Sequence, residues 1–161
     1  MFKRLLILSL LFTSVSYGQM IPHCAPLPSD GDALVLGGKQ PMLVMLENVS
    51  QNDIWLTHPV QNPSASAGWA TRIKPQHFTA LAVKTPDFIL ECIESKPGHE
   101  QQVACKGVIV ACKMNKTTFP KAEPDSGTYW AAEDQTLSAL TATLSGRGFS
   151  LPPLQETETQ P

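Results

Sequence analysis

Charged residues are scarce in this sequence, and the basic ones do not cluster. Asp, Glu, Lys and Arg together make up 16% of the chain, and the formal net charge is −2. No group of Lys and Arg residues follows the first four positions. A protein that holds nucleic acid by electrostatics needs such a group. We therefore expect no nucleic-acid partner.

The sequence also lacks an apolar run long enough to cross a bilayer. The apolar stretch from Leu5 to Phe12 is short, and it follows the basic residues 3–4. Small residues stand at Ser16 and Gly18, the recognition positions of a cleavage site. These features predict a secretory signal peptide over residues 1–18 and no membrane span after its removal. A retained N-terminal anchor is the alternative, and the shortness of the stretch argues against it.

Motifs for metal binding and for nucleophilic catalysis are lacking as well. No His-x-His, His-x₃-His or Cys-x₂-Cys spacing occurs, and the four histidines are His23, His58, His77 and His99. A copper site built from a histidine with Cys112 and Met114 would require Cys112 to be a free thiolate. No Gly-x-Ser-x-Gly elbow presents a serine nucleophile. We therefore predict no metal, no cofactor and no enzymatic activity.

Prolines recur about every ten residues through the middle of the chain, which excludes long helices there. Short apolar runs lie between them, and they predict strands near 69–73, 78–83 and 88–93. Residues 42–46 and 54–56 read as a hairpin with a polar loop. The fold class is therefore mostly β, an antiparallel sandwich or barrel of about seven strands in one domain over residues 19–151.

The clearest local pattern is a second hairpin, with strands over 88–94 and 103–109. Folding the chain about the intervening loop sets Glu91 opposite Lys106, a charge pair that favours an antiparallel ladder. The same register sets the aromatic residue at position 88 opposite the β-branched residue at 109, and it aligns two cysteines, which can then form a disulfide.

The even number of cysteines, all after the predicted cleavage site, predicts two disulfides in an exported protein. Four cysteines allow three pairings. The hairpin register selects Cys92–Cys105 and leaves Cys24–Cys112, which would tie the N-terminal arm to the sheet. Because Cys105 and Cys112 are seven residues apart, they would point to opposite faces of a strand and should not share a partner region.

One helix is predicted near the C-terminus. Leucines at 137, 140 and 144 have helical spacing, Asp134 is a suitable N-cap, and Gly146 stands where the helix should end. The tail over residues 152–161 is polar and is predicted to be disordered.

Tryptophans are the candidate recognition residues. Trp55, Trp69 and Trp130 are candidates for the core, because tryptophan is buried on average. Trp69 follows a loop rich in Pro, Ser and Ala, and Trp55 lies in a predicted strand, so either side chain is also a candidate contact for a partner.

Three segments together resemble a known family. They are Asn62-Pro-Ser-Ala-Ser-Ala-Gly-Trp69, the stretch from Cys92 to Cys105, and Gly127-Thr-Tyr-Trp-Ala-Ala-Glu133. This combination resembles the enhanced entry protein EnhB family of intracellular gamma-proteobacteria, over about Met42 to Leu151. The resemblance implies an exported envelope or secreted protein associated with entry into host cells. It names no active-site residue, so no functional residue is carried over.

These observations lead to an expected function. The chain is expected to be a periplasmic or secreted, non-enzymatic interaction module with an envelope or host protein as its partner. The alternative is a β-sandwich that binds a small ligand, a glycan or a lipid. Both need an exposed apolar or aromatic patch, which the sequence alone does not locate. The oligomeric state is left open.

Overall fold

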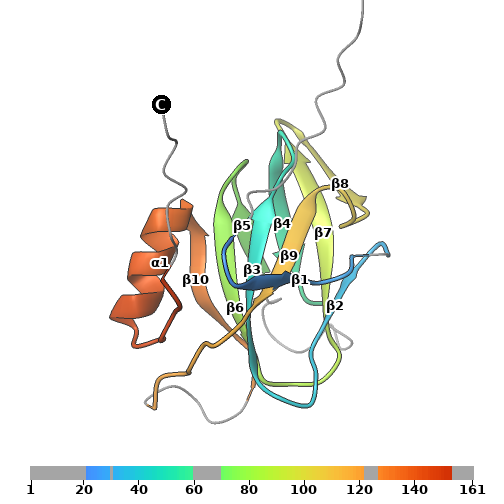
Figure 1. Cartoon of the computed structure of the whole chain (residues 1–161). Coiled ribbons are helices and arrows are strands. Elements are labelled where there is room, and N and C mark those ends of the chain that lie inside the picture. The colour runs from blue at the N-terminus through green and yellow to red at the C-terminus, as the bar shows by residue number, and fades with distance from the viewer. Residues whose placement is uncertain (1–20, 30, 60–69, 122–126, 154–161) are drawn as a thin grey trace, which may run out of the picture.

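The computed structural model describes residues 21–29, 31–59, 70–121 and 127–153, which form two antiparallel sheets and one helix (Figure 1). The first sheet has the strand order β1 (Cys24–Pro26), β9 (Ile109–Met114), β3 (Met42–Asn48), β6 (Phe78–Val83) and β10 (Tyr129–Gln135). The second sheet has the order β2 (Leu34–Leu36), β7 (Phe88–Lys96), β4 (Asp53–Thr57) and β5 (Ala70–Ile73), with β8 (His99–Val103) also paired to β7. The helix α1 spans Leu137–Gly146. The predicted fold class is confirmed, with ten strands in place of about seven.

The main core lies between the two sheets. It contains side chains from both, such as Val44 and Leu81 of the first sheet and Ile54 and Leu90 of the second. A second cluster lies on the other face of the first sheet, where the buried Leu140 and Leu144 of α1 pack against it. Strands β3 and β6 are therefore covered on both faces and buried along their whole length. This double coverage explains their nearly continuous apolar runs.

The strands of the second sheet alternate instead. In β4, Ile54 and Leu56 are buried, whereas Asp53, Trp55 and Thr57 are only partly covered. The same alternation occurs in β2, in β5 and in the first half of β7. A period of two is typical of a sheet with one face on the core and the other open. This sheet consequently has an outer face available for function.

The predicted hairpin over residues 42–56 is wrong. Strand β3 pairs with β6 and β9, whereas β4 pairs with β5 and β7, so the connection crosses from one sheet to the other. The buried Asn48 organises this crossing. Its Nδ2 donates to the carbonyl oxygens of Asn52 and Ile73, both at 2.8 Å, and its Oδ1 accepts from the amide and the hydroxyl of Ser50.

The second predicted hairpin begins with β7 as expected, but its second strand is β8 and not residues 103–109, and its register is also wrong. Strand β8 pairs with β7 so that Cys92 faces Val103 and Lys96 faces His99. The expected pairs Glu91–Lys106 and Phe88–Ile109 are therefore absent from the ladder. Phe88 instead faces Leu36 of β2, and Ile109 begins β9 in the other sheet.

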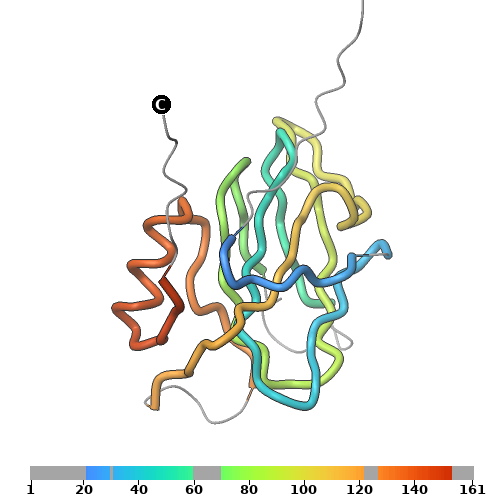
Figure 2. Tube along the Cα trace, in the orientation of Figure 1, coloured from blue at the N-terminus to red at the C-terminus, as the bar shows by residue number. Residues whose placement is uncertain are grey.

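Both disulfides join the cysteines that the sequence paired, although the geometry differs from the expected one. Cys105 lies in a turn after β8, and its buried side chain bonds to Cys92 with the Cα atoms 5.3 Å apart. Cys24 of β1 bonds to Cys112 of β9 and ties the N-terminal arm to the first sheet. From β1 the chain then crosses to β2 in the second sheet (Figure 2). Cys105 and Cys112 do not share a strand, contrary to the expectation, because only Cys112 is in β9.

The predicted helix ends at Gly146, as expected, but Asp134 is not its N-cap. Asp134 belongs to β10 with a φ of 44°, and Thr136 is the N-cap residue. The Asp134 carboxylate accepts hydrogen bonds from the backbone amide of Lys74 at 2.9 Å and from Nδ1 of His77 at 3.0 Å. It joins the turn between β5 and β6 to the end of β10. Long-range partners thus outweighed the local capping preference at this residue.

Candidate functional site

The candidate site is the outer face of the second sheet, which we call the open face. Its members are the outward-facing side chains of the sheet: Val35, Asp53, Trp55, Thr57, Ala70, Arg72, Ile89, Glu91, Ile93, Ser95, Glu100 and Gln102. Among the described residues, α1 packs on β10 and β6 of the first sheet and leaves this face uncovered.

Apolar side chains on the open face stand in register across neighbouring strands. Trp55 of β4 is directly opposite Ile93 of β7, and both are partly exposed. Val35 of β2 is opposite Ile89 of β7, with exposed fractions of 61% and 36%. A cluster of large apolar side chains on a sheet surface is a candidate contact for a partner, because burying it is favourable.

The charged groups of the open face are mostly acidic. Arg72 lies opposite Trp55, and its guanidinium donates to Oδ2 of Asp53, from Nε at 2.7 Å and from Nη2. Glu91 and Glu100 complete the set, so three carboxylates share the face with one guanidinium. The formal charge of these side chains is −2.

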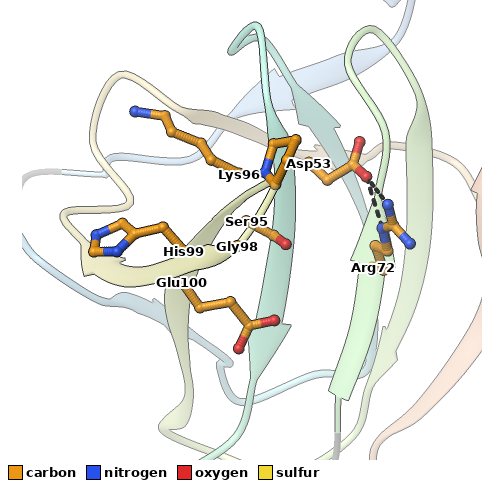
Figure 3. Close-up of a pocket in the computed structure, with 8 residues that line it drawn as sticks. Asp53, Arg72, Ser95, Lys96, Gly98, His99 and Glu100 are labelled. Atoms are coloured by element: carbon orange, nitrogen blue, oxygen red, sulfur yellow. Dashed lines mark hydrogen bonds and ion pairs between the residues drawn. The ribbon is translucent and has the colours of Figure 1, made fainter.

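A pocket of about 640 Å³ opens at the end of this face, beside the turn between β7 and β8 (Figure 3). It is lined by Asp53, Arg72, Ser95, Glu100 and the turn residues 96–99. In the register, Asp53 faces Ser95 and Ser95 faces Glu100, so two carboxylates flank one hydroxyl. The lining contains both hydrogen-bond donors and acceptors, which suits a polar group.

The cation nearest to the turn is already paired. Nζ of Lys96 lies 2.7 Å from Oε2 of Glu94, whose Oε1 accepts from Nδ2 of Asn52 at 2.8 Å. The hydrogen bonds from Lys96 and then Asn52 hold the pKa of Glu94 below its ordinary value of 4.5. Lys96 is therefore committed to Glu94 and does not offset the acidity of the open face.

The structure separates the residues that the sequence proposed for recognition. Trp55 lies on the open face, whereas Trp69 lies outside the described residues. Trp130 is partly buried and packs against the core between the sheets. Sequence reasoning missed Ile93 and Arg72 as neighbours of Trp55, because only the strand order brings β5, β4 and β7 together.

The thiolate that a copper site at Cys112 would require is absent, because Cys112 is bonded to Cys24, as the sequence predicted. Within the described residues, no group of three His, Cys, Asp or Glu side chains is arranged to hold a metal ion. The closest histidine–carboxylate pair that we identify, His77 with Asp134, shares its carboxylate with Nζ of Lys74 at 2.9 Å. This cluster links structural elements.

Comparisons with protein-family models, with curated proteins and with solved structures gave no match. Over the described part of the chain, no helix has the length and apolar character needed to span a membrane. The two disulfides indicate an oxidising compartment outside the cytoplasm.

Proposed function

We propose that this protein is a non-enzymatic binding module that recognises a protein partner through its open face. The observation that carries the proposal is the asymmetry between the sheets. In the first sheet, α1 covers the outer face over β6 and β10, while the second sheet presents Trp55 with Ile93 and Val35 with Ile89 in register. Exposed aromatic and aliphatic side chains of this kind supply the central contacts of many protein interfaces.

The disulfides and the predicted signal peptide support the compartment, and the family resemblance supports the class of partner. Two disulfides favour an exported protein, and the predicted signal peptide makes the periplasm or the exterior its destination. The resemblance to enhanced entry proteins supports a role in host-cell entry, with an envelope or host protein as the partner. In the sheet that carries the open face, the Cys92–Cys105 disulfide ties the turn after β8 to β7.

A second candidate function is binding of a glycan or another small polar ligand. The pocket beside the β7–β8 turn favours it, because donors and acceptors there lie near an aromatic side chain. In this case the ligand would contact Asp53, Arg72 and Glu100, and the apolar residues farther along β7 would contribute little. The two functions therefore predict different sensitivities to substitutions at positions 35 and 89.

Affinity capture with the mature, oxidised protein distinguishes them. Wild-type protein, Trp55→Ala, Val35→Ser and the control Val110→Ala are immobilised and exposed to envelope extract. Val110 is a matched control because it is 39% exposed but lies on the other sheet. We expect a protein partner that is retained by Val110→Ala and lost by Trp55→Ala and by Val35→Ser. A partner retained equally by all variants would refute the open face as the binding surface. A captured glycan insensitive to Val35→Ser would favour the second function.

A further inference from the structure

The side chains of the open face fall into four rows that run across the strands. The first row is Asp53, Ser95 and Glu100, and the second is Arg72, Trp55, Ile93 and Gln102. The third is Ala70, Thr57 and Glu91, and the fourth is Ile89 and Val35. Along β7 and its neighbours, carboxylates in the first and third rows therefore alternate with apolar side chains in the second row, at Trp55 and Ile93, and in the fourth, at Ile89 and Val35. Successive rows are two residues apart, which is about 7 Å along a strand.

Each acidic row contains a carboxylate that forms no salt bridge with another described residue. Asp53 is paired with Arg72, and Lys96 is paired with Glu94. Within the described part of the chain, no salt bridge is formed by Glu100 in the first row or by Glu91 in the third. A partner that brings a cation to each of these two rows gains charge complementarity, which improves specificity and association rate.

The row spacing also selects the backbone conformation of the partner. In an extended chain, every second side chain points to the same side, and the repeat of about 7 Å equals the row spacing. A helix can match the spacing between two successive rows, because residues four apart in sequence lie about 6 Å apart along its axis. Each such step turns the side chain by about 40°, so the third and fourth contacts would rotate away from the sheet. An extended segment keeps its register over all four rows.

We propose that the open face binds an extended segment of a partner protein in which basic and apolar residues alternate at every second position. This inference rests on the proposed function and specifies its partner. The first basic side chain would enter the pocket beside Glu100 and Ser95, two of the lining residues drawn in Figure 3. The next apolar side chain would lie on Trp55 and Ile93. The second basic side chain would meet Glu91, and the last apolar one would pack on Ile89 and Val35.

Defined peptides test this inference on the mature, oxidised protein. The probe is an acetylated and amidated peptide containing Lys-Thr-Leu-Thr-Lys-Thr-Leu. One comparison peptide has Glu in place of both Lys residues, and another has the same composition in the order Lys-Thr-Lys-Thr-Leu-Thr-Leu. Binding is followed by amide and indole chemical shifts in an NMR titration at low and at high salt. We expect shifts at Trp55, Glu91 and Ile93, with about tenfold weaker binding of the acidic peptide.

Charge-neutral variants then assign the preference to the two carboxylates. In Glu91→Gln combined with Glu100→Gln, the basic peptide should lose most of its advantage over the acidic one. Glu133→Gln is the matched control, because Glu133 is exposed in β10 of the other sheet, and it should keep the full preference. The inference would be overturned if the basic and acidic peptides bound equally, or if the two basic peptides of different residue order bound equally. Chemical-shift changes away from the open face, or no changes at all, would also overturn it. The capture experiment with Trp55→Ala is read separately, so the proposed function can stand when this inference fails.

Discussion

Trp55 of β4 stands directly opposite Ile93 of β7, and both side chains are partly exposed on the outer face of the second sheet. An aromatic side chain next to a β-branched one stabilises a sheet, but only by about 0.2–1 kcal/mol. The pair is therefore a small contributor to folding. Its partly exposed apolar surface is the surface through which we propose that the protein contacts a partner.

Substitutions at this pair should consequently separate binding from stability. Trp55→Ala is expected to lower the free energy of unfolding by about 1 kcal/mol, because the side chain is only partly buried. Leu90→Ala removes a fully buried side chain and should cost about 2–5 kcal/mol. Urea unfolding of both variants measures the difference. A loss for Trp55→Ala as large as that for Leu90→Ala would mean that Trp55 is part of the core.

The two disulfides should differ in their contribution to stability. Cys24–Cys112 spans 88 residues and Cys92–Cys105 spans 13. If a disulfide stabilises by lowering the entropy of the unfolded chain, closing the longer loop adds about 4.7 kcal/mol to the free energy of unfolding and closing the shorter one about 3 kcal/mol. Thermal unfolding of the two double Cys→Ala variants tests this order. If the loss of Cys92–Cys105 is the more damaging, packing of its buried sulfurs outweighs the loop term.

Substitution of Asn48 should lower the free energy of unfolding more than substitution of most other polar residues. Its amide donates to two carbonyl oxygens and its carbonyl accepts from Ser50, all at the crossing between the sheets. Asn48→Asp removes the donor and brings a carboxylate close to two carbonyl oxygens. We expect it to lower the free energy of unfolding by about 3 kcal/mol or more, measured by urea denaturation. Unfolding within 1 kcal/mol of the wild type would contradict this role for Asn48.

Asp134 should make the stability of the protein pH-dependent. Burial raises its pKa, but the hydrogen bonds from the backbone and side chain of Lys74 and the charges of Lys74 and His77 outweigh it, so the pKa is lower than the ordinary 3.8. The ionised form is thus favoured by folding. This contribution is fully present above pH 3.8 and is lost as the pH falls through the lower folded value.

Comparison of the wild type with Asp134→Asn measures that contribution. Asparagine tolerates a positive φ but carries no charge, so the variant should lose stability at pH 7 and show a flatter decline on acidification. Glu133→Gln serves as the neighbouring control and should follow the wild type. Parallel pH profiles for Asp134→Asn and the wild type would refute the assignment.

Local patterns in the sequence predicted the elements better than their arrangement. The alternation in β4 and the continuous apolar run of β3 both identified strands. Neither pattern shows which sheet a strand joins, so the hairpin expected between them was wrong. The cysteine pairing was predicted correctly from an incorrect register, because Cys105 reaches Cys92 from a turn rather than from the opposite strand.

The candidate site shows the same limit. Trp55 was a candidate from its residue type, but the open face also takes residues from four other strands, β2, β5, β7 and β8. Arg72 and Glu100 join the site only through the pairing of β5 with β4 and of β8 with β7. At Asp134, hydrogen bonds from a distant turn replaced the expected cap of α1.

Site-specific photocrosslinking tests the open face most directly. A benzophenone side chain is placed at position 35 or 89 on the open face, and at position 110 on the other sheet as a control of similar exposure. The oxidised proteins are irradiated in envelope extract and in host-cell extract. The account predicts one shared protein adduct from positions 35 and 89, absent from position 110 and abolished by Trp55→Ala. Adducts formed equally from position 110, or unchanged by Trp55→Ala, would contradict it.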